Sequence, residues 1–568
     1  MMVVAGRGCV VLERVPPGGS PGAKTMWLAA VFWLSTVACP LSTSAQTDDE
    51  IVAEIDQQIR QAWEDNKVKP SPRTEDGEFA RRVSLDTVGH IPALNPLLEF
   101  LQDTAADKRR RLVDELLDDP DYIEHWSTIW GNLLVGRSNR RNRAARNDLD
   151  KWLRQALAKN QSYDRFAAEL ISATGSSDDN GAIGFLASHL NEMAVPATAI
   201  TARIFLGQQV QCTQCHNHPF NDAKQSQFWG LNAFFRGTRR QNVGQNNETI
   251  YMTDDLADPV VFFEKRNGTM EAVTRRFIDG ESPPTDIVAP RHQLAAMISD
   301  PSQPLLAQAY VNRMWGHFLG TGFTKPVDDM GPHNPPSHPE LLDYLALRFR
   351  GSGFDTKRLI RWITASEAYQ LTSRSTPENA ADDPGTGSTP LFTHVGVKPF
   401  TAEQLYDSLL IATAADKAGR SFQQSEQKRD EWLQQFVQTF GTDENDETST
   451  FNGTVPQAFV MMNGDLVRNA ISGGKGSFLR TVYEGNIPEL VETRNTKKSK
   501  SLKGLPAVKT IPGKIELLFL AALSRRPSPG ELRALDSAYQ RAGGRDPVMG
   551  LQDVFWAILN ANEFILNH

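Results

Sequence analysis

The sequence predicts a mainly α protein, with two helical domains and a small β-hairpin insertion between them. Apolar residues recur at helical spacing through both halves of the chain, and strand-like spacing is confined to residues 246–282. A length of 568 residues also exceeds one ordinary core. We therefore expect a leader over 1–45, a helical domain over 46–240, a β insertion or linker over 241–290 and a second helical domain over 291–568.

The leader has the features of a targeting segment. Lys24 precedes an apolar run at 26–38 that has the length of a signal-peptide core and is too short to span a bilayer. Met26 would be a conventional start for such a signal, and small residues precede Gln46, where we expect the mature chain to begin. The alternative is lipoprotein processing at Cys39. Either route predicts an exported, periplasmic or extracytoplasmic protein.

Charge and hydrophobicity argue against two kinds of partner, nucleic acid and the membrane interior. The net charge of −8 gives no support for a nucleic-acid partner, and the basic runs at 137–146 and 497–500 contain no interleaved aromatic residues. No stretch after the leader has 18 consecutive apolar residues, so no transmembrane helix is expected in the mature chain.

The first half is expected to be helical throughout. Ile51, Ile55, Ile59 and Trp63 recur every four residues and predict an opening amphipathic helix. Further helical patterns follow in order at 112–117, 126–134 and 149–157. Residues 197–207 predict a helix that leads into the chemical motif described below, and 228–235 predict an aromatic-rich helix that is either core or the wall of a cofactor site.

After this helix the spacing of apolar residues changes from helical to strand-like, and it becomes helical again in the second half. Residues 260–263 and 270–277 flank Asn267-Gly268 and predict a β-hairpin with a tight turn. In the second half the spacing of a capping box predicts three helix starts, at Ser337 with Glu340, Thr401 with Gln404, and Ser528 with Glu531. Helical spacing at 551–559 predicts a closing helix.

The strongest chemical signal is the Cys-x-x-Cys-His at Cys212, Cys215 and His216, with His218 two residues further on. The other two of the four cysteines lie in the leader. The pattern is the attachment signature of c-type haem, in which two thioethers hold the vinyl carbons and the adjacent imidazole ligates iron. The same atoms suit two alternatives, a zinc ion held by Cys212, Cys215 and His218, or a structural or redox disulfide.

A haem site would need a second axial ligand that the motif does not supply. His218 is too close to His216 to reach the opposite face of the iron, so the candidates are His189, Met193 and Met252. This reading predicts electron transfer with a redox partner protein. The alternative is a non-redox binding, hydrolytic or scaffold protein.

A second polar cluster stands in the C-terminal half, at His317, Asp328, Asp329, His333 and His338. Carboxylates and imidazoles this close in sequence could bind a metal or perform acid–base catalysis, and we hypothesise that the carboxylates face His317 or His338 across a cleft. The alternative is structural: the aspartates bond loop amides, and His338 lies in the first turn of a helix.

Four stretches together resemble a known family of exported, planctomycete-type cytochrome-like proteins that pair two domains of unknown function. The resemblance implies an N-terminal cytochrome-like domain and a C-terminal partner domain, both mostly helical, and it implies little about activity. Asn217 and Asn221 stand where the family often has an acidic residue. The stretches are Arg81-Arg82-Val83-Ser84-Leu85-Asp86, residues 211–220 around the Cys-x-x-Cys-His, residues 312–339, and Asn560-Ala561-Asn562-Glu563-Phe564.

Overall fold

The computed structural model describes the chain from residue 46 onward, with gaps. Residues Thr47–His568 form one compact unit. The predicted leader, with Met26 and Cys39, lies outside the described residues, as does Asn221. The described ranges are 46–137, 143–219, 222–243, 249–256, 260–415, 427–428, 431–436, 439, 455–485, 508–542 and 546–568.

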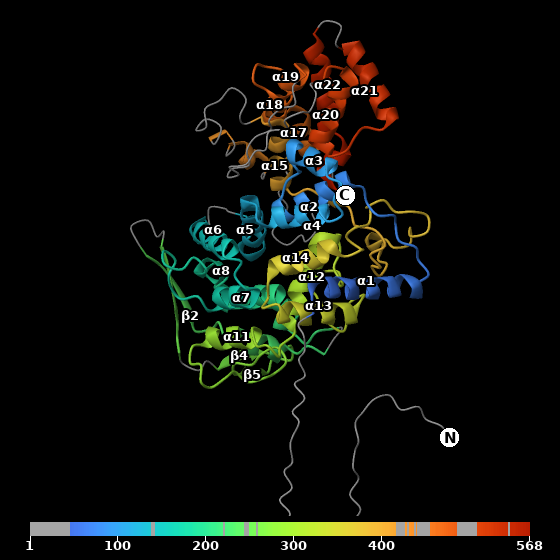
Figure 1. Cartoon of the computed structure of the whole chain (residues 1–568). Helices are drawn as coiled ribbons and strands as arrows, with labels where there is room; N and C mark the ends of the chain where they lie inside the picture. The colour runs from blue at the N-terminus through green and yellow to red at the C-terminus, as the bar shows by residue number, and fades with distance from the viewer. Residues whose placement is uncertain are drawn as a thin grey trace, which may run out of the picture. The chain divides into compact units, whose positions relative to one another are not determined.

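The first half consists of amphipathic helices, as predicted. Ile51, Ile55, Ile59 and Trp63 are all buried on one face of α1. The helices are α1 (Asp48–Asp65), α2 (Asp76–Val88), α3 (Leu94–Gln102), α4 (Lys108–Leu117), α5 (Pro120–Val135), α6 (Arg143–Ala158), α7 (Tyr163–Ser172), α8 (Ile183–Ala187), α9 (Val195–Thr201) and α10 (Gln225–Asn232), with short turns η1 (Glu192–Ala194), η2 (Ala202–Leu206) and η3 (Gln211–Gln214) (Figure 1).

The second half is also helical. Its α11 packs on α7, and α12 packs on both α13 and the turn η2, so the core is continuous across the two halves. The elements are α11 (Pro290–Ile298), α12 (Leu305–Leu319), α13 (Pro339–Gly351), α14 (Thr356–Ala365), η4 (Pro384–Thr386), α15 (Ala402–Thr413), α17 (Val455–Asn463), α18 (Asp465–Ala470), α19 (Phe478–Tyr483), α20 (Ile511–Leu523), α21 (Pro529–Ala542), α22 (Pro547–Leu559) and η5 (Asn562–Ile565).

The sheets in the described ranges are small, which confirms the mainly α prediction. The middle strand of the largest, β3 (Thr249–Asp254), pairs antiparallel with β2 (Thr238–Val243) and with β1 (Gly175–Ser176). A second sheet pairs β4 (Val261–Glu264) with β5 (Met270–Val273). No helix in these ranges is both long enough and apolar enough to cross a membrane.

The pairing of β4 with β5 confirms the predicted hairpin, with a longer turn than expected. The backbone N–H of Gly268 donates to the carbonyl of Lys265, and the N–H of Lys265 donates to the carbonyl of Thr269. Gly268 has a φ of +80°, which favours glycine. The extra loop residue lets a common right-handed turn close the hairpin, with glycine taking the left-handed position.

Two of the three predicted capping boxes form. Thr401 and Gln404 make both reciprocal bonds, and so do Ser528 and Glu531. The prediction at Ser337 is wrong. Helix α13 begins at Pro339 with His338 as its N-cap and without a side-chain cap bond, because the hydroxyl of Ser337 contacts the ring of His338 instead.

The stretch 81–86 is a buried junction between the two halves. Arg81 is fully buried on α2, and its guanidinium donates to the carbonyl oxygens of Ala522 and Phe564. Arg82 is equally buried and donates to the carbonyl oxygens of Tyr369 and Leu371. Each arginine therefore bonds carbonyl groups at helix ends and turns of the C-terminal half, where the regular helical pattern does not supply a donor.

Asp86 completes this junction. Its carboxylate accepts bonds from Lys398 Nζ at 2.6 Å, Asn567 Nδ2 at 2.7 Å and the hydroxyl of Tyr369 at 2.8 Å. Lys398 and Asn567 lie on the paired strands β6 (Lys398–Pro399) and β7 (Leu566–Asn567). The first and last of the four resemblance stretches meet directly through Arg81 and the carbonyl of Phe564, and Asp86 adds the contact with Asn567 just beyond the last stretch.

Candidate functional site

Gly207 ends the helix that leads into the Cys-x-x-Cys-His. Helix α9 continues as a π-helical turn in η2 and stops at Gly207, whose φ is +65°. A Cβ there would lie 2.8 Å from Sδ of Met330, so the close approach also requires glycine. The carbonyl of Gly207 accepts a 2.7 Å bond from the N–H of Met330. The C-terminal half therefore contacts the chain just before the motif.

The motif itself lies at the surface. Cys212 and Cys215 are exposed, free cysteines. His216 is half-buried, and its Nδ1 lies 2.6 Å from the carbonyl oxygen of Asn217. Because a carbonyl only accepts, Nδ1 carries the proton in this contact and Nε2 keeps the lone pair that can ligate a metal. This donor set fits covalent haem, with two accessible thiols and an oriented imidazole.

Helix α10 is the platform on which the motif rests. The side-chain amide of Gln225 donates to the carbonyl of Gln214 at 3.1 Å and to that of Glu264 at 2.9 Å. The indole N–H of Trp229 also donates to the carbonyl of Gln214, at 3.1 Å. The side chain of Asn217 accepts a bond from the N–H of Gln225. Helix α10 thus holds the chain between the two cysteines, at Gln214, and just after the motif, at Asn217.

A small apolar cluster lies on the same platform. It joins α9, α10 and the inner face of the β4–β5 hairpin, and Val210 at the start of the motif packs against it. The predicted aromatic-rich helix therefore contributes to the support of the motif. The cluster consists of Val195, Phe228, Trp229, Ala233, Val261 and Phe263.

Asp328 connects the second predicted cluster to the motif. Its side chain is 2% exposed, and its carboxylate accepts a 3.0 Å bond from the amide of Gln209. Arg203 lies 3.6 Å away and Arg313 lies 3.9 Å away. A buried carboxylate needs such partners to remain charged. Asp328 therefore braces the segment that leads into the Cys-x-x-Cys loop.

Asp329 and His333 also lie beside the motif. Nε2 of His333 is 3.0 Å from Oδ1 of Asp329. The ring of His333 faces the ring of His218, with centroids 5.3 Å apart. Asp328, Asp329 and His333 therefore come together with the Cys-x-x-Cys-His loop, which the sequence did not predict.

His317 and His338 lie elsewhere, so the hypothesis that the aspartates face them is wrong. His317 contacts the carbonyl of Asp86 at 2.9 Å, and burial, together with the nearby charge of Lys398, lowers its pKa to about 4. His338 is 7% exposed and packs against Phe392. Burial lowers the pKa of His338 to about 4 as well. Both are packed, neutral histidines near pH 7.

The three candidates for a second axial ligand differ in their surroundings. Nε2 of His189 contacts the carbonyl of Leu134, and Met252 is fully buried in β3. Met193 is 61% exposed. It lies in a run of three residues with φ of 49°, 60° and 62°, which is rare outside glycine. The amide of Asn232 on α10 holds this turn through a 3.1 Å bond to the carbonyl of Met193.

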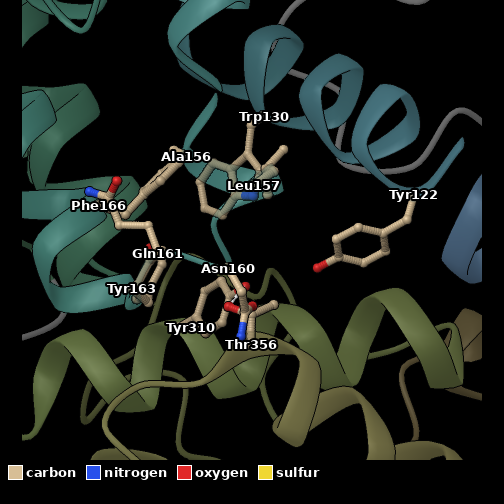
Figure 2. Close-up of a pocket in the computed structure, with 10 residues that line it drawn as sticks. All are labelled: Tyr122, Trp130, Ala156, Leu157, Asn160, Gln161, Tyr163, Phe166, Tyr310 and Thr356. Carbon is tan, nitrogen blue, oxygen red and sulfur yellow. Dashed lines mark hydrogen bonds between the residues drawn. The ribbon is translucent and has the colours of Figure 1, made fainter. Parts of the chain in front are cut away.

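Within the described ranges no three histidine, cysteine or carboxylate side chains are grouped closely enough to hold a metal ion. A small cavity lies between α5, α6 and α7 on one side and α12 and α14 on the other (Figure 2). Its volume of about 20 Å³ has room for roughly one water. It is separate from the predicted site residues and is lined by Tyr122, Trp130, Ala156, Leu157, Asn160, Gln161, Tyr163, Phe166, Tyr310 and Thr356.

Comparison with known proteins identifies two domains. Residues 54–240 match the family PSCyt2, described as a protein of unknown function (DUF1549), and residues 290–539 match the family PSD1, described as a protein of unknown function (DUF1553). No curated protein and no solved structure matches the chain significantly. The Cys-x-x-Cys-His falls in the first match, and Asp328, Asp329 and His333 fall in the second. The chain therefore pairs these two domains of unknown function, in the order that its motifs predicted.

Proposed function

We propose that the protein is exported, carries covalent haem on Cys212, Cys215 and His216, and exchanges electrons with a redox partner protein. The observation that carries the proposal is the orientation of His216 beside two exposed thiols. Its Nδ1 is engaged by the carbonyl of Asn217, as in metal-bound imidazoles, which directs Nε2 to a ligand. Export would bring the thiols to a compartment in which such attachment occurs.

The surrounding residues have defined roles in this proposal. Gln225 and Trp229 fix the carbonyl of Gln214 and so hold the spacing between the two thiols. Asp328 braces the approach to the loop through Gln209. Haem, when bound, would supply a one-electron iron couple. The exposure of both cysteines leaves an edge of the site open to a partner protein.

Expression in the periplasm together with a haem-maturation system tests the proposal. We expect a red protein whose haem absorbance persists after denaturation, because thioether bonds survive unfolding. The double substitution C212S/C215S should abolish this retained absorbance. Replacement of the exposed His292 by alanine should leave it unchanged.

Colourless protein from the same cells would overturn the proposal. One equivalent of zinc in that protein, or a Cys212–Cys215 disulfide detected by mass spectrometry, would instead favour the alternative, a non-redox binding, hydrolytic or scaffold protein. Zinc in that case would use Cys212, Cys215 and His218.

We also propose Met193 as the second axial ligand. Its exposed thioether is carried on a turn that α10 holds, and α10 also supports the motif. In haem-loaded protein, Met193→Ala should keep the covalent haem, lower the reduction potential and open the iron to added imidazole, because methionine ligation raises the potential. Absorption spectra and redox titration provide the readout.

Met270→Ala is the matched control, because Met270 is also 61% exposed but lies on β5. It should change neither the spectrum nor the potential. If Met193→Ala behaves in the same way as this control while the haem remains attached, Met193 is not the ligand.

A further inference from the structure

His218 and His333 bring two imidazoles together from two domains. His218 follows the Cys-x-x-Cys-His in the first domain, and His333 lies in the loop after α12 in the second. Their ring centroids are 5.3 Å apart, and the ring planes are inclined by 41°. The haem proposal uses neither ring, so this contact needs a separate explanation.

The separation of the two ring centroids is compatible with a shared metal ion. With metal–nitrogen bonds of about 2.0–2.1 Å, each ring centroid lies roughly 3.2 Å from the ion. Two imidazoles at a tetrahedral angle then have centroids roughly 5.2 Å apart. The observed centroid separation is close to this value.

The contact with Asp329 favours the tautomer of His333 that is suited to bind a metal. A carboxylate only accepts, so Nε2 of His333, at 3.0 Å from Oδ1, carries the proton in this contact. In the neutral ring the lone pair is then on Nδ1. A metal-bound histidine whose other nitrogen donates to a carboxylate is a recurrent arrangement in metal sites. The side chains of His333 and Asp329 are 20% and 24% exposed, so both are accessible to ions from solvent.

A side chain at position 331 would crowd that nitrogen. A Cβ at this position would lie 3.0 Å from Nδ1 and 2.9 Å from Cε1 of His333. Gly331 is not among the glycines with positive φ, so its backbone conformation does not require glycine. Glycine at this position therefore avoids a close contact with the Nδ1 edge of His333.

The two loops are also held in register next to the rings. The N–H of Met330 bonds to the carbonyl of Gly207, and Asp328 bonds to Gln209. These contacts join the two chain segments a few residues before His333 and just before the Cys-x-x-Cys-His, so they tie together the two segments that carry the histidines. Pre-positioned ligands bind an ion with less loss of conformational entropy.

We propose that His218 and His333 bind one divalent transition-metal ion between the two domains. Asp329 orients His333, and water occupies the remaining positions. Imidazole ligands suit zinc, copper and nickel ions. The site uses neither thiol and not His216, so it stands whether or not haem is attached. It also differs from the thiolate zinc site, because its second ligand comes from the second domain.

Zinc titration of the mature, full-length C212S/C215S protein tests the proposal, because that background removes thiolate binding. Isothermal calorimetry should show one equivalent of Zn²⁺. His218→Ala and His333→Ala should each abolish this binding. Asp329→Asn should weaken it by about 10–100-fold, the usual effect of removing a carboxylate that orients a metal-bound histidine. Gly331→Ala should also weaken it, because the new Cβ fills the space at Nδ1.

His292→Ala is the control, since this histidine is exposed and lies outside the site. Circular dichroism checks that each variant is folded. Loss of all zinc binding in C212S/C215S would contradict the proposal and favour a thiolate site. Unchanged affinity in His333→Ala would contradict it as well, because no ion would then connect the two domains.

Discussion

Replacement of Asp86 by alanine is expected to lower the free energy of unfolding by about 3–5 kcal/mol, the usual cost of removing one partner from a buried ion pair. The carboxylate is 1% exposed and accepts bonds from Lys398, Tyr369 and Asn567. Alanine would leave the lysine charge and two polar groups without this partner inside the junction. Urea unfolding followed by circular dichroism measures the effect as a lower midpoint with an unchanged slope.

Asp118→Ala is the matched control, because Asp118 also pairs with a lysine, Lys357, at 3.2 Å, but its side chain is 78% exposed. It should cost no more than about 1 kcal/mol. Asp86→Asn should fall between the two, since it keeps an acceptor for Tyr369 and loses the charge that faces Lys398. Equal costs for Asp86→Ala and Asp118→Ala would show that the junction does not hold the two halves together.

Most helices could be predicted from sequence because their burial pattern is local. The four-residue recurrence from Ile51 to Trp63 is enough to define the buried face of α1, whatever the helix packs against. The capping box at Ser337 failed because it depends on a specific side-chain contact and not on a repeating pattern. The hydroxyl of Ser337 bonds the ring of His338 and so does not cap the helix. The capping-box pattern in the sequence does not include this contact.

The composition of the candidate site was only partly predictable. The Cys-x-x-Cys-His is contiguous, so its residues could be named from spacing alone. The approach of Asp328, Asp329 and His333 to this motif depends on how α12 packs on η2, which no local pattern encodes. Gln225 was missed for a similar reason. A single glutamine at a helix start carries no periodic signal, although its amide connects the Cys-x-x-Cys segment to the end of strand β4.

The stretch 81–86 illustrates why a sequence motif does not reveal its role. Two arginines and an aspartate within six residues could belong to a reactive site or to a structural one. In the structure both arginines are fully buried and bond backbone carbonyls, and the aspartate bonds a lysine and two neutral groups. These buried contacts join the two halves of the chain.

Acidification from pH 7 towards pH 4 should destabilise the protein through His317 and His338. Burial, reinforced at His317 by Lys398, lowers the pKa of each to about 4 from an ordinary value near 6.5. Between these values the unfolded chain binds more protons than the folded one, so unfolding is favoured as the pH falls. Each histidine should then cost on the order of 3 kcal/mol across the window. Unfolding free energies measured in urea at several pH values test this.

His317→Gln and His338→Gln should each reduce the slope of stability against pH between about 6.5 and 4, since glutamine keeps a hydrogen-bonding group and does not titrate. His292→Gln is the control, because His292 is exposed and should leave the slope unchanged. Carboxylates affect the pH dependence of stability in a lower pH range. The hydrogen bond from Arg525 lowers the pKa of Glu531 to about 2 from 4.5, so its contribution is lost only as the pH falls below about 4.5. A double variant of His317 and His338 with the slope of the parent protein above pH 4.5 would show that neither histidine is held neutral by the fold.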